Sequence, residues 1–185
     1  MLPEGWKRVT LDKCVDLLTG YAFSSDDYVE PSELSIRLLR GDNIVPGSLR
    51  WDDAKHYPQQ CASNLARYEL REGDVVIALD RPVVGAGLKC CTVKCDDLPC
   101  ILVQRVARLR ASGSIDQNYL AQVMQTSKFA SHLLSQKTES AVPHISPNDI
   151  RNYDVVLPQM QEQRWISSML ETWDKAIAVT GKHLA

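Results

Sequence analysis

The C-terminal stretch constrains the fold of this chain most. A short apolar run, Val155-Val156-Leu157, meets Pro158, and nothing from Gln159 to Leu184 breaks a helix except Gly181. Proline suits the first turn of a helix because its missing N–H is not needed there, and Glu162 adds negative charge near the positive end of the helix dipole. The sequence therefore predicts two elements that meet at Pro158, and the second is a long helix.

The predicted helix carries a narrow apolar seam. Its larger apolar residues recur at steps of 4, 3 and 4, and the pattern continues to Thr180 and Leu184 at steps of 3 and 4. The seam residues are Ile166, Leu170, Trp173 and Ile177. Such spacing is typical of a coiled-coil heptad. At about 1.5 Å per residue the helix reaches roughly 40 Å, more than a domain of this size needs for its own core. We therefore expect another helix to cover the seam.

Composition narrows the class of protein. The chain has 185 residues, of which 44% are hydrophobic and 24% charged, and this fits one globular domain with an appendage. No apolar run approaches the roughly 20 residues that span a bilayer, and the first residues do not resemble a signal peptide. We expect a cytoplasmic protein that makes no membrane contact. The net charge is −2, so any nucleic-acid binding must come from local basic patches.

The rest of the pattern predicts an α+β fold with mixed or antiparallel strands and short helices. Strands are expected within residues 6–18, before a turn at Gly20, and at 36–39, 75–79 and 101–111; short helices are expected around 119–124, from 127 and from 146. In the last strand, Val103, Ala107 and Leu109 would face the core, opposite Gln104, Arg108 and Arg110. We assign residues 1–154 to the globular domain and 155–185 to the helical appendage.

The six cysteines are expected to be reduced, because the chain does not look like a small secreted protein. Cys90, Cys91, Cys95 and Cys100 lie close enough in sequence to offer thiolates to zinc. We favour small packed side chains over a metal site.

The search for catalytic motifs yields two weak candidates. Asp42, Asp53 and Lys55 could form a metal-dependent nuclease site, although solvated loop charges explain them equally well. One cysteine could act with His144, which lies in the turn AVPHIS, although an ordinary loop histidine is an equal alternative. No phosphate-binding loop, nucleophile elbow or zinc-protease motif is present.

Several ordered fragments carry a family resemblance. They are LPEGWKRVTL, TGYAFSSDDY, LLRGDNIVPGSLRW, LREGDVVIALDRP, LVQRVARLR, YLAQVM, AVPHISPNDI and VVLPQMQEQRWI. Together they resemble one target-recognition half of the DNA specificity subunit of Type I restriction-modification systems. The resemblance implies a recognition domain followed by a conserved helix that pairs antiparallel with its counterpart. Complete subunits have two such halves, so we expect a half-size subunit or a fragment.

The resemblance also implies a function. The domain would read one half of a bipartite site in double-stranded DNA, and the helix would dock the methyltransferase (modification) subunits and pair with a second recognition half or a second copy. Restriction subunits would join through the complex. The chain would be non-catalytic and would hold no cofactor or metal, because S-adenosylmethionine would bind the methyltransferase subunit. A protein-interaction adaptor that uses only the seam is the remaining alternative.

Loop residues are the candidates for DNA contact. Arg40 and Asn43 follow a strand end, and their side chains match the edges of guanine and adenine respectively. Arg81 lies in the loop LDRPVVGAGLK, where two glycines permit close backbone approach and Lys89 closes the loop. The full candidate set is Tyr21, Ser24, Ser25, Arg40, Asn43, Arg81, Lys89 and His144. For each arginine, a solvated surface charge is the alternative.

The cysteine assignment leads to a first prediction. If Cys90, Cys91, Cys95 and Cys100 are small packed side chains, the purified chain contains no stoichiometric zinc and keeps its circular dichroism spectrum in a chelator. Metal analysis and a chelator titration measure this. One zinc per chain, with unfolding on chelation, would contradict it.

Overall fold

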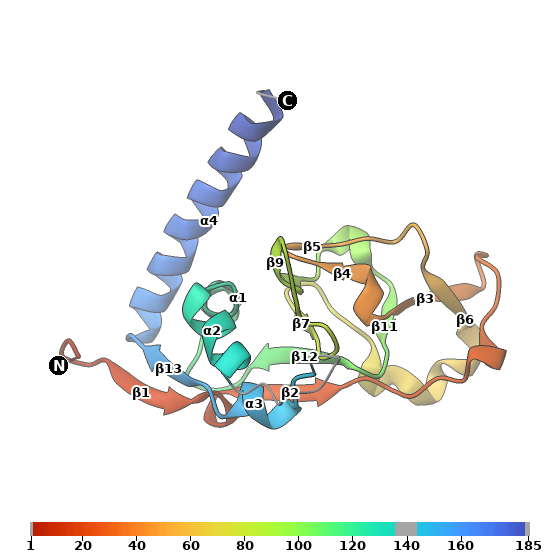
Figure 1. The fold of residues 1–185 in the computed structure, drawn as a ribbon, viewed down its shortest axis with the longest axis horizontal. Coiled ribbons are helices and arrows are strands. Elements are labelled where there is room, and N and C mark those ends of the chain that lie inside the picture. The colour runs from red at the N-terminus through yellow and green to blue at the C-terminus, as the bar shows by residue number, and fades with distance from the viewer. Residues whose placement is uncertain (1, 136–143, 184–185) are drawn as a thin grey trace.

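A four-stranded antiparallel sheet forms the centre of the computed structural model, which describes residues 2–135 and 144–183 (Figure 1). Its strand order is β10-β7-β12-β2. The strands are β2 (Val15–Thr19), β7 (Val75–Ala78), β10 (Cys90–Thr92) and β12 (Val106–Ala111). The α+β fold predicted from the sequence is confirmed.

A smaller three-stranded sheet lies at the end of the molecule away from the C-terminal helix (Figure 1). Its order is β11-β3-β6, with β11 parallel to β3 and β6 antiparallel to it. The strands are β3 (Ser35–Leu39), β6 (Lys55–Pro58) and β11 (Cys100–Leu102). Two short hairpins, β4 (Ile44–Val45) with β5 (Ser48–Leu49) and β8 (Val83–Val84) with β9 (Gly87–Leu88), connect the larger strands.

The two ends of the chain meet in a third sheet. Strand β1 (Lys7–Thr10) pairs antiparallel with β13 (Asp154–Leu157), and helix α4 (Met160–His183) follows directly. The predicted boundary between residues 154 and 155 therefore falls inside β13, whose residues belong to the globular domain. Pro158 precedes the helix instead of lying in its first turn, and Glu162 accepts a hydrogen bond from the backbone N–H of Gln159, 3.0 Å away.

Three short helices cover one face of the central sheet. They are α1 (Gln117–Met124), α2 (Ser127–Ser135) and α3 (Pro147–Arg151), each close to its predicted position. Ser146 caps α3 as predicted: its hydroxyl accepts from the Asp149 N–H at 3.2 Å, and its own N–H donates to the Asp149 carboxylate at 2.7 Å. Short 3-10 helices span Leu11–Lys13, Ser25–Asp27, Gly41–Asn43, Gln59–Cys61, Ser63–Tyr68 and Cys95–Asp97. No helix among the described residues is both long and apolar enough to cross a bilayer.

The single strand predicted over residues 101–111 is wrong, because this segment forms β11 and β12 in two different sheets. Val103 joins an apolar cluster with the small sheet, whereas Ala107 and Leu109 join the core under the helices. Arg108, expected on a solvent face, is 3% exposed. The central sheet is covered on both faces, so the alternation in β12 does not separate core from solvent.

The two sheets join where the end of β2 crosses the segment between β11 and β12. Gly20 donates its N–H to Val106 O and Tyr21 donates to Leu102 O, each at 3.1 Å. A β-carbon on Gly20 would overlap the carbonyl group of Val103 and would lie 2.7 Å from the carbonyl carbon of Leu102. Only glycine permits this approach, so Gly20 is a close backbone crossing. The turn expected at Gly20 is absent, because the chain continues from β2 into the bridge that Tyr21 forms with Val103.

We therefore predict that Gly20→Ala destabilises the fold by on the order of 3 kcal/mol, because backbone atoms on both sides cannot yield to a methyl group. Urea unfolding followed by circular dichroism measures the free energy of unfolding. Gly85→Ala is the control, because a β-carbon there meets nothing within 4 Å. Equal stability of the two variants would contradict this account of the crossing.

Candidate DNA interface

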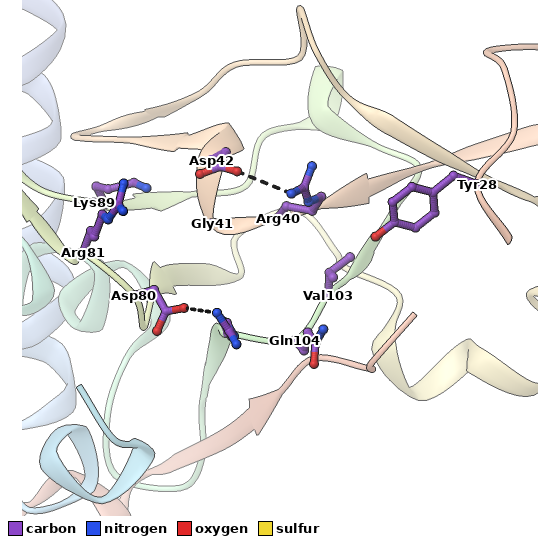
Figure 2. A pocket seen from close by; sticks show the side chains of 10 residues that line it. Tyr28, Arg40, Gly41, Asp42, Asp80, Arg81, Lys89, Val103 and Gln104 are labelled. Carbon is purple, nitrogen blue, oxygen red and sulfur yellow. Dashed lines mark hydrogen bonds and ion pairs between the residues drawn. The ribbon is translucent and has the colours of Figure 1, made fainter. Parts of the chain in front are cut away.

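A basic pocket opens beside this crossing, where the ends of β3 and β7 meet the turn between β11 and β12 (Figure 2). Four basic side chains and two carboxylates line it, although the whole chain has a net charge of −2. The lining residues are Tyr28, Arg40, Gly41, Asp42, Asp80, Arg81, Lys89, Val103, Gln104 and Arg105. The pocket is therefore the kind of local basic patch that DNA binding by an acidic chain requires.

Arg40 reaches the pocket because β3 ends at Leu39 and the chain turns into the 3-10 helix Gly41–Asn43. Its guanidinium lies 3.5 Å from the Asp42 carboxylate, and 37% of its side chain is exposed. Asn43 holds this turn: its amide oxygen accepts from the Arg40 N–H and its amide nitrogen donates to Arg50 O, both at 3.0 Å. Since Asn43 is buried with its amide bound to backbone, we remove it from the candidate DNA contacts.

Arg81 and Lys89 come from the segment after β7. The predicted loop LDRPVVGAGLK is folded as the β8–β9 hairpin, and the Lys89 N–H closes it by donating to Pro82 O at 2.7 Å. Burial lowers the pKa of Lys89, and the positive charges of Arg50 and Arg81 lower it further, against the opposing effect of Asp42 and Asp80. Crowded cations of this kind favour the arrival of an anion.

Asp80 ties three segments together at the edge of the pocket. Its carboxylate accepts from Arg105 Nη1 at 2.8 Å and lies 2.5 Å from His144 Nδ1. Burial alone would raise the pKa of Asp80, but the hydrogen bonds and charges of His144 and Arg105 outweigh burial and lower it. His144 is held beside β7 because the next residue, Ile145, donates its N–H to Leu79 O at 2.9 Å.

The remaining candidates lie outside the pocket lining. Tyr21 is 42% exposed, and its ring contacts Phe23 with a centroid separation of 5.0 Å. Ser24 accepts from the Asp26 N–H at 3.4 Å and begins a 3-10 helix whose first residue is Ser25. From the same segment it is Tyr28 that lines the pocket.

Sequence reasoning missed Tyr28, Asp80, Gln104 and Arg105. The clearest available signal was the polar pair Gln104-Arg105, which interrupts the alternation of the segment predicted as one strand. Two successive polar residues between apolar ones are typical of a turn and not of a half-buried strand. The two turns that do end predicted strands, at Arg40 and Arg81, meet in one pocket.

The enzyme alternatives gain no support from the geometry. Asp42 lies in the basic pocket, but Asp53 and Lys55 do not, and no group of three His, Cys, Asp or Glu side chains within residues 2–135 and 144–183 could hold a metal.

Burial raises the pKa of Cys14 to about 11 and of Cys91 and Cys100 to about 12, and that of Cys90 further still. Cys61 and Cys95 are exposed, so Cys95 is not the packed side chain that we expected.

Helix α4 contacts its own domain with a polar face. Gln163 and Ser167 are buried there, and the Gln163 amide bonds Asp116 N, Ser114 O and Pro158 O at 2.9–3.0 Å. The apolar seam points elsewhere: Leu170, Trp173 and Ile177 are 37%, 63% and 69% exposed. Trp165 and Met169 widen the exposed stripe, Ile166 is half-buried, and Leu184 lies outside the described residues.

Two relatives are similar in sequence to this chain over nearly its whole length. The chain is 36% identical over 171 residues to the EcoAI Type I restriction enzyme specificity subunit of Escherichia coli. The match covers 92% of this chain and 28% of the relative. It is 30% identical over 182 residues to the MjaVIII specificity subunit of Methanocaldococcus jannaschii, covering 98% of this chain and 42% of the relative. The chain thus spans less than half the length of these relatives.

Solved structures share the fold. The crystal structure of the HsdS subunit from Thermoanaerobacter tengcongensis superposes with a TM-score of 0.70 at 22% identity, covering 100% of this chain and 41% of that one. Residues 3–185 match the family model described as Type I restriction modification DNA specificity domain. The chain therefore belongs to the family of Type I restriction-modification DNA specificity domains.

Proposed function

We propose that this chain recognises one half of a bipartite DNA sequence and delivers a partner methyltransferase to it. The observation that carries the proposal is the basic pocket on a chain of net charge −2. Family membership agrees with this choice over an adaptor that uses only the α4 stripe. Methylation and cleavage would reside in partner subunits, and S-adenosylmethionine would bind the methyltransferase subunit.

The pocket offers both kinds of contact that sequence-specific binding needs. Arg81 and Lys89 present positive charge from one side and Arg40 from the other, which suits phosphates that flank a groove (Figure 2). Gln104 also lines the pocket, and an amide side chain suits the adenine edge. Tyr21, Ser24 and Ser25 would extend the contact along the neighbouring backbone, and His144 would act through Asp80.

Helix α4 would provide the assembly surface. Polar contacts of Arg164 with Asp116 and of Asp174 with Gln122 hold it against α1, so the exposed stripe is left for another protein. A second recognition half, or a second copy related by a two-fold axis, would supply the antiparallel partner helix, and the methyltransferase subunits would dock on the pair. Restriction subunits would join through that complex, in the cytoplasm where the DNA lies.

We predict that Arg40→Ala and Arg81→Ala each weaken DNA binding by about tenfold or more, because each variant loses a charge-assisted hydrogen bond worth ~1.5–3 kcal/mol. Fluorescence anisotropy with labelled duplex at several salt concentrations measures this. Stability should change little, since the Arg40 ion pair is exposed. Arg67→Ala is the control, because this exposed arginine lies outside the pocket. Unchanged affinity for both pocket variants would remove the pocket from the interface.

We also predict that Leu170→Asp combined with Ile177→Asp abolishes self-association or methyltransferase docking, because the charges would be buried in an apolar interface. Light scattering reports assembly, and circular dichroism checks that the domain stays folded. Ser168→Asp with Thr172→Asp is the control, since these exposed residues lie on another face of α4. A wild-type chain that stays monomeric with its methyltransferase subunit, and a double variant that docks normally, would exclude α4 as the assembly element.

A further inference from the structure

Two arginines of the pocket have a left-handed backbone. Among the described residues, Arg81 with φ of 46° and Arg105 with φ of 64° are the non-glycine residues with positive φ. A β-carbon crowds the backbone in this region, whereas glycine adopts it freely. Such conformations cluster at functional sites, where the surrounding structure enforces them. The chain thus carries arginine at two positions where its backbone favours glycine, and both line one pocket.

Hydrogen bonds hold the turn that contains Arg105 from two sides. The Gln104 N–H donates to Tyr21 O at 2.8 Å, and Arg105 O accepts from the Leu79 N–H at 2.8 Å. One contact comes from the segment after β2 and the other from the segment after β7. The backbone of Arg105 is therefore fixed, and so is the direction in which its side chain leaves the turn.

A carboxylate also orients the side chain of Arg105. Asp80 accepts from Arg105 Nη1 at 2.8 Å and is itself held by His144, yet 70% of the Arg105 side chain is exposed. An arginine loses much rotational freedom when it binds, and holding it in advance reduces that loss. Arg81 differs, because its guanidinium has no hydrogen-bond or ion-pair partner within the described residues.

This difference separates two kinds of DNA contact. A phosphate accepts hydrogen bonds from many directions, so an unconstrained cation suits it. Paired contact with O6 and N7 of guanine requires the guanidinium plane to be set correctly, so an oriented arginine suits a base edge. The two arginines have the same side chain and a similar backbone, but only Arg105 is oriented by a carboxylate.

On the basis of the proposed function, we propose that Arg105 is a specificity-determining residue that reads one guanine of the half-site through O6 and N7, while Arg81 contacts phosphate. Asp80 is the positioning residue for Arg105, and His144 holds Asp80 in place. The left-handed turn at Gln104-Arg105 directs the guanidinium toward the major groove of the bound DNA.

The test is selection from a pool of random DNA duplexes by the full purified chain at low salt. Wild type is expected to enrich duplexes with one guanine at a constant position. Arg105→Ala removes the planar fork, so this preference should disappear and affinity for the enriched duplex should fall roughly tenfold or more. Arg81→Ala, the matched variant at the other left-handed arginine, should bind DNA more weakly but should enrich the same sequence as wild type.

A modified base separates base reading from phosphate contact. Replacing the selected guanine by 7-deazaguanine removes the N7 acceptor, so it should weaken binding by wild type and by Arg81→Ala but not by Arg105→Ala. Arg105→Gly should lose the selection while its thermal unfolding midpoint is no lower than that of wild type, because glycine adopts positive φ freely.

The outcomes distinguish this inference from the proposed function. A wild-type chain that enriches no sequence would overturn the function, and the inference with it. A wild type and an Arg105→Ala variant that enrich the same guanine would overturn the inference alone. So would an Arg105→Gly variant whose unfolding midpoint falls well below that of wild type, since Arg105 would then serve the fold.

Discussion

The crossing of the β2 end over the β11–β12 segment is the constraint on which the rest of the structure depends. Gly20 hydrogen-bonds the backbone of β12, and Tyr21 hydrogen-bonds the backbone of β11. The approach at Gly20 leaves no room for a β-carbon. Because of this contact, β11 can end in the small sheet and β12 can begin in the central sheet with only a short turn between them. That turn carries Gln104 and Arg105, so the basic pocket exists only where the crossing holds.

Covering both faces of the central sheet obliges the protein to neutralise charge inside it. Arg108 pairs with Asp16, and Arg110 Nε lies 2.5 Å from the carboxylate of Asp74, whose side chain is 3% exposed. Asp74 also accepts from the Arg71 N–H at 2.8 Å, which fixes the turn that leads into β7. The Asp16 side chain is 64% exposed, whereas Asp74 is buried, and for the Arg110–Asp74 pair desolvation offsets much of the attraction. Both pairs set which residues of β2, β7 and β12 lie side by side, and β7 leads directly to Asp80 and Arg81.

The basic pocket and the apolar stripe of α4 differ in which side chains they leave exposed. At the pocket, cations are crowded beside few carboxylates, and this burial and repulsion lower the pKa of Lys89. On α4 the polar residues Gln163 and Ser167 face the domain, and the apolar stripe faces outward. A helix that served only its own domain would turn its apolar face inward, because burial of apolar surface favours folding. The reversed arrangement fits the proposal that the pocket binds a polyanion and the α4 stripe binds protein.

Much of this architecture was predictable from local pattern. The α+β class, the short helices, the Ser146 cap, the seam of α4 and the charged ends of β3 and β7 depend on residues near one another in sequence. Hence Arg40, Arg81 and Lys89 could be selected before the fold was known.

Only the tertiary structure decided which loops meet and which polar groups are free to bind. Asn43 is buried, and its amide group hydrogen-bonds the backbone N–H of Arg40 and the backbone oxygen of Arg50. Arg105 enters the pocket because Gly20 lets a segment distant in sequence cross beside it. Asp80 reaches His144 because Ile145 donates its N–H to Leu79 O, which holds residue 144 beside the end of β7. Contacts between segments 25 or more residues apart leave no periodic signal in either segment, so local sequence patterns cannot reveal them.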